Sequence, residues 1–478
     1  MKVLKKRNII VIISPIILLI LIGIIFSNPN TKPPINEPVS VASVDSEPFY
    51  VGVTYCGDSV SEAKQLIDKV KTYTNLFVLQ SGTLQRQPDQ INQIVDYAVD
   101  SDLHFIVYFG NQHSNYRGDW LRTFDNRWDN HFLGVYYGDE PGGKMLDGNS
   151  SFAGNITINM ISKWMDGSVS FNLRDISSSV TYQPDGIILL TKKEHDNFGA
   201  IINATYTTYN PNGTITVEIQ ENNGPRIQVE NNYSVSLTYE ELWNIRPFQS
   251  YDETSDRFIN THQSRIMRGI QDYWDVTAFT SDYALHWFDY QAGYDVILAQ
   301  FGWNHTLAQD IALVRGAANL QNKSWGTIIT WKYNHSPYLD SGDAIYEQMR
   351  TSYETGAKYA VIFNYAENMT GPYGTLLEEH FVALERFWNQ VVQNSDVNQG
   401  SIKGEAVLVL PENYGWGMRN PEDKIWGLWG PDEKSLQIWE LSRNLLEQYG
   451  FGLDIVYEDS EFPVEDKYGQ IFYWNQTS

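Results

Sequence analysis

Acidic side chains stand where buried-looking apolar runs of the sequence give way to loops. Asp139 and Glu140 follow one run in the segment YYGDEP, Glu367 follows another in FNYAEN, and Asp282 follows a third. Two carboxyl groups in aromatic and amide-rich surroundings can serve as proton donor and as nucleophile or base, the two roles that cleavage of a glycosidic bond requires. The candidate catalytic residues are Glu140 and Glu367, with Asp139 and Asp282 in reserve.

Aromatic and amide side chains occur at the ends of the same kind of run. Tyrosine (30) and tryptophan (15) are abundant in this chain, and their flat amphipathic rings suit either a ligand or packing at the rim of a sheet. The candidates for substrate binding are His113, Tyr137, Gln300, Trp303, Asn304, Trp331 and Tyr365.

The elements that must position these residues form an α/β pattern. Near-continuous apolar runs that alternate with amphipathic helical stretches predict a buried parallel sheet. Residues 49–395, less an insertion, leave roughly 240 residues, close to the about 250 typical of a (β/α)8 barrel, with a doubly wound open sheet as the alternative. The eight predicted strands are 49–55, 75–80, 104–109, 132–137, 276–280, 294–300, 325–331 and 358–365.

Two further regions depart from this alternation of strands and helices. Residues at about 145–250 carry strand patterns, including a hairpin that turns at Asn210–Gly213, and predict a β-rich insertion after strand four. Residues 402–478 contain an apolar run, a helical stretch and a second apolar run, and predict a small C-terminal α/β module. Its topology resembles the flavodoxin-like domains that follow the catalytic barrel in some β-galactosidase families.

The N-terminus predicts an extracellular location at the cell membrane. Four basic residues precede the uncharged stretch Ile9–Phe26, which is just long enough to cross a bilayer once and lacks an adjacent cleavage site. We therefore expect residues 1–26 to be a cytoplasmic tip and transmembrane signal anchor in contact with lipid, and the proline-rich residues 27–48 to be a stalk. Ten Asn-x-Ser/Thr sequences after the anchor would suit a glycoprotein, although an asparagine-rich composition also explains them.

Composition excludes several classes of function. The formal net charge of −24 would repel a phosphate backbone, so we expect no nucleic-acid partner. A single cysteine, Cys56, excludes an intrachain disulfide and any multi-cysteine metal site. The sequence has no HExxH, phosphate-binding loop, GxSxG or dinucleotide fingerprint, so we predict no metal and no cofactor.

The segment FLGVYYGDEP resembles the catalytic strand of TIM-barrel glycoside hydrolases, which place an acidic residue at the end of strand four. The resemblance implies a carbohydrate substrate and assigns the general acid to Glu140. Large retaining families place the second glutamate on strand seven, where this chain has Trp331 and Lys332, and the nearest substitute is Glu367 on strand eight. Strands four and eight face each other, which favours a wide carboxyl gap and an inverting mechanism. The missing strand-seven acid motivates the alternative, a non-catalytic glycan-binding or cell-envelope structural protein on a barrel scaffold.

Overall fold

The structure is a computed structural model of the full chain. It describes residues 48–478 except 111–113, 124–127, 129, 148–160, 164–168, 173–177, 184–185, 196–200, 222–223, 230–237, 240–241, 243–249, 267–275, 304, 366–370 and 477–478.

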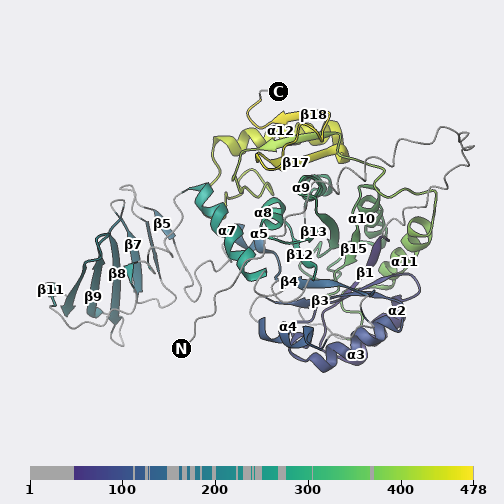
Figure 1. Ribbon diagram of the computed structural model, residues 1–478, viewed down its shortest axis with the longest axis horizontal. Coiled ribbons are helices and arrows are strands. Elements are labelled where there is room, and N and C mark those ends of the chain that lie inside the picture. The colour runs from purple at the N-terminus through teal and green to yellow at the C-terminus, as the bar shows by residue number, and fades with distance from the viewer. Residues whose placement is uncertain are drawn as a thin grey trace, which may run out of the picture. The chain divides into compact units, whose positions relative to one another are not determined.

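Eight parallel strands close into a barrel, which confirms the predicted architecture and excludes the open sheet (Figure 1). The strand order around the barrel follows the chain, with β15 paired to β1 to complete the circle. Each observed strand lies within about three residues of the range predicted from its apolar run. The strands are β1 (Tyr50–Tyr55), β2 (Leu76–Leu79), β3 (His104–Phe109), β4 (Phe132–Tyr137), β12 (Ala278–Asp282), β13 (Val296–Phe301), β14 (Ser324–Ile329) and β15 (Tyr359–Ile362).

The barrel strands are apolar on both faces because both faces are buried. One set of side chains, including Val78, Ile106, Phe279 and Leu298, packs into a cluster that draws on all eight strands and fills the barrel interior. The other set packs against the surrounding helices. These helices are α2 (Val60–Val70), α3 (Pro88–Val99), α4 (Ser114–Leu121), α5 (Pro141–Leu146), α7 (Tyr251–Ile266), α8 (His286–Gln291), α9 (Leu307–Leu320), α10 (Gly342–Glu354) and α11 (Glu378–Phe387).

The chain between α5 and α7 forms a separate antiparallel sheet of seven strands, as the strand patterns after strand four predicted. The predicted hairpin joins β9 to β10, with the amide of Gly213 donating to the carbonyl of Asn210. The strands are β5 (Ile161–Lys163), β6 (Val169–Asn172), β7 (Ser178–Tyr182), β8 (Ile188–His195), β9 (Ile201–Tyr209), β10 (Ile215–Glu221) and β11 (Ile227–Gln228).

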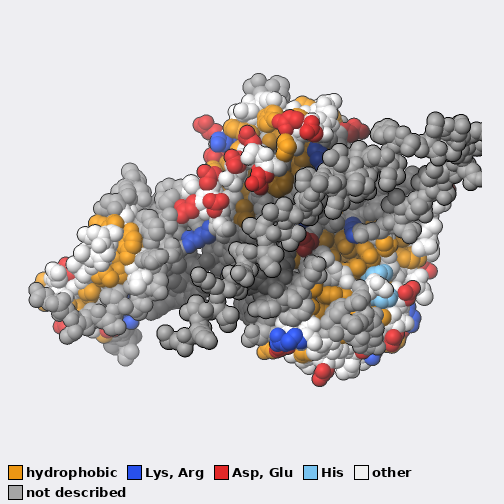
Figure 2. Space-filling model, in the orientation of Figure 1, with side chains coloured by type: hydrophobic (Ala, Val, Ile, Leu, Met, Phe, Trp, Pro, Cys, Tyr) orange, Lys and Arg blue, Asp and Glu red, His pale blue; other side chains and the backbone are white. Residues whose placement is uncertain are grey.

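The C-terminal residues form a three-stranded parallel sheet in the order β17-β16-β18. Its elements are β16 (Ala406–Leu410), α12 (Glu433–Tyr449), β17 (Leu453–Tyr457) and β18 (Gln470–Tyr473). This module packs on α9 of the barrel, where Arg315 donates to Asp454 of β17 at 2.8 Å with both side chains almost fully buried. Residues 402–478 contain 14 acidic and six basic side chains, and Figure 2 shows acidic groups gathered over the module at the top of the view.

The predicted anchor Ile9–Phe26 and stalk 27–48 fall almost wholly outside the described residues, which begin at Pro48. Within the described part of the chain, no helix combines the length and apolar character needed to cross a membrane.

Candidate active site

Glu140 stands at the carboxyl end of β4, at the start of α5, where a barrel of this kind exposes its reactive groups. Its backbone is left-handed, with φ 53° and ψ 51°, a conformation that is costly for a residue with a side chain. The Glu140 amide donates to the carbonyl of Ser281 at 2.9 Å, which ties this backbone to β12. The surrounding structure therefore holds the glutamate in a strained backbone conformation.

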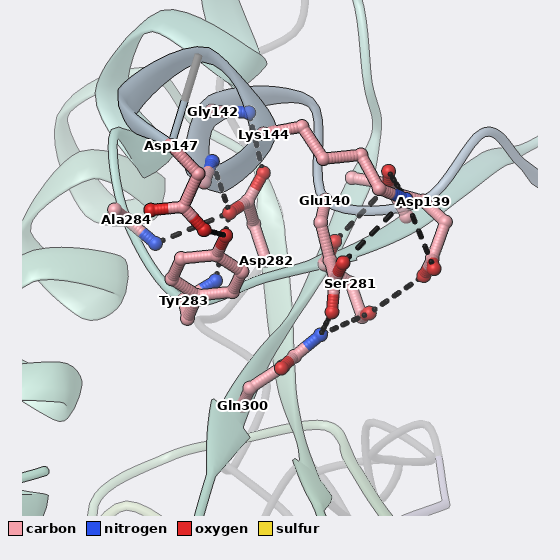
Figure 3. A network of polar contacts seen from close by, with 12 residues as sticks. Asp139, Glu140, Gly142, Lys144, Asp147, Ser281, Asp282, Tyr283, Ala284 and Gln300 are labelled. Atoms are coloured by element: carbon pink, nitrogen blue, oxygen red, sulfur yellow. Dashed lines mark hydrogen bonds and ion pairs between the residues drawn. The ribbon is translucent and has the colours of Figure 1, made fainter. Parts of the chain in front are cut away.

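Two donors hold the carboxylate of Glu140 (Figure 3). Nε2 of Gln300, on β13, donates to Oε1 at 2.8 Å, and Nζ of Lys144, one helical turn on, lies 3.5 Å from Oε2. Burial and the charge of Asp139 raise the pKa of Glu140 above its ordinary value, and Gln300 and Lys144 offset part of that rise. The Glu140 side chain keeps 27 % of its surface exposed, so its carboxyl can reach a ligand.

Asp139 forms a second polar cluster beside Glu140. Its Oδ1 accepts from the hydroxyl of Tyr136 at 2.6 Å and from Oγ of Ser281 at 3.3 Å, and its Oδ2 lies 3.3 Å from Nζ of Lys144. Gln300 also donates to Oγ of Ser281 at 3.0 Å. The two adjacent carboxylates are thus joined directly through Lys144 and indirectly through Gln300 and Ser281.

Asp282 occupies a different environment from these two acids. Its side chain is fully buried at the end of β12 and accepts backbone N–H bonds from Gly142, Gly143, Tyr283 and Ala284 at 2.6 to 3.2 Å. Burial and the charge of Glu140 raise the pKa of Asp282 to about 7, against the lowering effect of the N–H bonds. The structure places this reserve candidate beneath α5, out of contact with solvent.

Aromatic residues follow the neighbouring strands β13, β14 and β15 at the same end of the barrel. Trp331 stacks on Tyr365 with ring centroids 6.0 Å apart and donates from Nε1 to the Tyr365 carbonyl at 2.8 Å. Trp303 meets Trp331 edge-on at 6.1 Å and is 41 % exposed. These three candidates therefore form one partly exposed aromatic cluster.

The remaining candidates differ in position. Tyr137 is buried, with the guanidinium of Arg117 lying 4.4 Å from its ring centroid, and Gln300 is buried as well but reaches Glu140. Glu367, His113 and Asn304 lie outside the described residues.

Sequence reasoning missed Lys144, Ser281 and Tyr136 as members of the site. Lys144 could have been found, because it stands four residues after Glu140 at the start of a helix and such residues share a face. Ser281 could not, because its contact with Asp139 joins residues 142 positions apart.

Among the residues that the structure describes, no group of three or more histidine, cysteine, aspartate or glutamate side chains is arranged to hold a metal ion. The arrangement around Glu140 is instead suited to proton transfer, because it combines a partly buried carboxyl of raised pKa with a charged neighbour. No protein-family model and no curated protein sequence matched the chain.

Proposed function

We propose that the protein hydrolyses glycosidic bonds in oligosaccharides or polysaccharides. The observation that carries the proposal is Glu140, a half-buried carboxyl of raised pKa at the carboxyl end of a barrel strand, held by Gln300 and Lys144. A carboxyl of raised pKa keeps its proton to a higher pH than an ordinary glutamate and can pass it to a leaving oxygen, which is the role of the general acid in this chemistry.

Asp139 assists this role through its charge. A negative charge beside Glu140 disfavours ionisation of the glutamate, and hydrogen bonds from Tyr136 and Ser281 keep the Asp139 carboxylate in place. Glu367 remains our proposal for the opposite carboxylate, which would activate water in an inverting mechanism. Tyr365, two residues before it, lies in the aromatic cluster with Trp331.

The aromatic cluster would hold sugar rings. Trp303, Trp331 and Tyr365 follow three consecutive strands of the barrel that carries Glu140, and each leaves part of its ring uncovered. Rings presented in this way bury large apolar faces at little cost in conformational entropy. We further propose that the barrel lies outside the cell, held at the membrane by an anchor at Ile9–Phe26, and that it is glycosylated. The C-terminal module is proposed to be of flavodoxin-like type.

A second candidate function is glycan binding without turnover. It is favoured by one observation, that an aromatic side chain, Trp331, and not an acid, follows the seventh barrel strand. An aromatic cluster alone would be enough to bind a saccharide.

The test uses the full chain in detergent against a panel of glycans and aryl glycosides. Glu140→Gln keeps the size of the side chain and an oxygen that can accept from Gln300, but an amide cannot act as an acid. Hydrolysis should therefore fall about 10²- to 10⁴-fold, with binding retained. The loss should be smaller for aryl glycosides with activated leaving groups, which need little protonation. Glu440→Gln, on the exposed face of α12, is the matched control.

Each outcome separates the two functions. Hydrolysis that Glu140→Gln removes supports the enzyme. Binding without hydrolysis by the unmutated chain supports the glycan-binding alternative, and hydrolysis that survives Glu140→Gln unchanged would refute the assignment of the general acid.

A further inference from the structure

Two carboxyl groups are buried together beneath the candidate active site. Asp282 ends β12 and Asp289 lies on α8, and both side chains are 0 % exposed. Burial and then the charge of Asp282 raise the pKa of Asp289 well above its ordinary value. Neither group belongs to the set of residues that the proposed hydrolysis uses directly.

The two carboxyls have opposite hydrogen-bonding environments. Asp282 accepts four backbone N–H bonds, which stabilise its ionised form. Both carboxyl oxygens of Asp289 lack a hydrogen-bond partner of normal length within the described part of the chain. A buried carboxylate without donors is strongly disfavoured, so a proton shared by this pair resides on Asp289.

The donors to Asp282 connect it to Glu140. Gly142 and Gly143 are the second and third residues of α5, and they donate to Oδ2 and Oδ1 of Asp282 at 2.6 and 2.8 Å. Figure 3 shows the Gly142 amide directed at the Asp282 carboxyl. Asp282 therefore fixes the first turn of the helix whose preceding residue is the left-handed Glu140. A shift of this turn would also move Lys144, which contacts Glu140 and Asp139.

No cation neutralises the pair from the elements packed against it in the described residues. Burial lowers the pKa of His286 to about 4, so this histidine of α8 is neutral at pH 7 although its Nε2 lies 3.2 Å from the Asp282 carbonyl. Lys144 of α5 is directed to Asp139 and Glu140 (Figure 3). Among the described residues, the other titratable groups that interact with the two carboxyls are Glu140, Tyr283, Tyr290 and Tyr294, and His286 contacts only the backbone of Asp282.

We propose that Asp282 is a positioning residue for Glu140, and that Asp289 carries the proton of the pair so that Asp282 can hold the α5 N-terminus as a carboxylate. The role in catalysis rests on the proposed function of Glu140, whereas the hold on α5 does not. Asn is a close mimic of a protonated Asp, so Asp289→Asn should be tolerated. Asp282→Asn should not, because one amide oxygen cannot replace a carboxylate that accepts four N–H bonds.

The first measurement is hydrogen exchange of the full chain, followed by mass spectrometry of the peptide that contains Gly142 and Gly143. Asp282→Asn should speed exchange there at least tenfold, whereas Asp289→Asn should stay within threefold of the unmutated chain. The rate at which a carbodiimide modifies the Glu140 carboxyl should differ from that of the unmutated chain in Asp282→Asn but not in Asp289→Asn. Equal effects of the two variants, or no effect of Asp282→Asn, would overturn the proposal.

Two further measurements keep the test decisive. If Asp282→Asn fails to fold, exchange of the unmutated chain serves instead. Below about pH 7 Asp282 gains a proton and accepts the N–H bonds less strongly. A local opening of this turn that leaves Asp282 buried should then become more frequent, and the protection factor of the peptide should fall. If the panel yields a substrate, Asp282→Asn should lower kcat more than it changes KM and should shift the pH profile, and an unchanged profile would refute positioning. The expected exchange results without any hydrolysis would refute only the proposed enzyme.

Discussion

The buried ion pair between the barrel and the C-terminal module gives a quantitative prediction. Arg315 on α9 is 3 % exposed, and its guanidinium donates to Asp454 of β17 at 2.8 Å and to the carbonyls of Phe451 and Leu453 at 2.7 and 3.1 Å. Asp454 also accepts from the hydroxyl of Tyr468 at 2.7 Å. Burial nevertheless keeps the pKa of Asp454 above its ordinary value, so the pair compensates a large desolvation cost only in part.

Arg315→Met keeps an unbranched apolar stem at this position and removes the charge and the donors of the guanidinium. Asp454 is then left as an unpaired buried carboxylate, which costs about 3 to 5 kcal/mol. Because each 1.36 kcal/mol is a factor of ten, amides of β16 and β17 should exchange about 150- to 5,000-fold faster if they exchange through opening of the module.

A double variant provides the control. Arg315→Met with Asp454→Asn removes both charges and keeps an acceptor for Tyr468, so it should recover at least half of the lost free energy. Hydrogen exchange of the same β16 and β17 peptides measures the free energy of opening in the single and the double variants. An effect of Arg315→Met below tenfold, or a double variant worse than the sum of the single ones, would refute the reasoning that the unpaired charge dominates.

Three other predictions concern a cysteine, a glycine and a buried aspartate of the barrel. Burial raises the pKa of the Cys56 thiol to about 12, so its reaction with a disulfide reagent at pH 8 should be at least tenfold slower in the folded chain than in urea, and equal rates would contradict this. Gly142→Ala should cost about 1 to 3 kcal/mol in urea unfolding, because the new Cβ would lie 2.5 Å from the Ala284 carbonyl oxygen, whereas Gly430→Ala meets nothing within 4 Å and should be neutral. The pKa of Asp282 is raised to about 7, above its unfolded value, so its contribution to stability should fall as pH rises from about 4 to 7, by up to about 4 kcal/mol. Asp282→Asn should flatten that part of the stability curve, and an unchanged slope would assign the dependence to other groups.

The barrel could be predicted from sequence because each of its strands is a local pattern. Runs such as FIVYF and VILA are apolar without alternation, and only a strand covered on both faces requires this. The inserted sheet between β4 and β12 did not prevent the prediction of a barrel, because strands and helices alternate again after α7. Strand ends were harder to place, and β12 ends at Asp282, two residues beyond its predicted range.

The role of Asp282 shows where sequence reasoning stopped. An acid after an apolar run predicts a position at the carboxyl end of the barrel, and Asp282 does lie there. Whether its carboxyl faces a ligand or the interior depends on Gly142, which is 140 positions away in the chain. No local pattern specifies a contact between residues so far apart, because tertiary packing decides it.

Glu140 illustrates how the same surroundings give neighbouring acids different chemistry. Glu140 has two side-chain partners, Gln300 and Lys144, and its proton affinity is raised by burial and by a neighbouring charge. Asp282 has a raised proton affinity too, but its oxygens accept four backbone N–H bonds and are fully buried, so no substrate reaches them. A raised pKa alone therefore does not select a proton donor, because the carboxyl must also reach solvent. Of these two acids only Glu140 meets both conditions, which is why the proposed role of general acid falls to it.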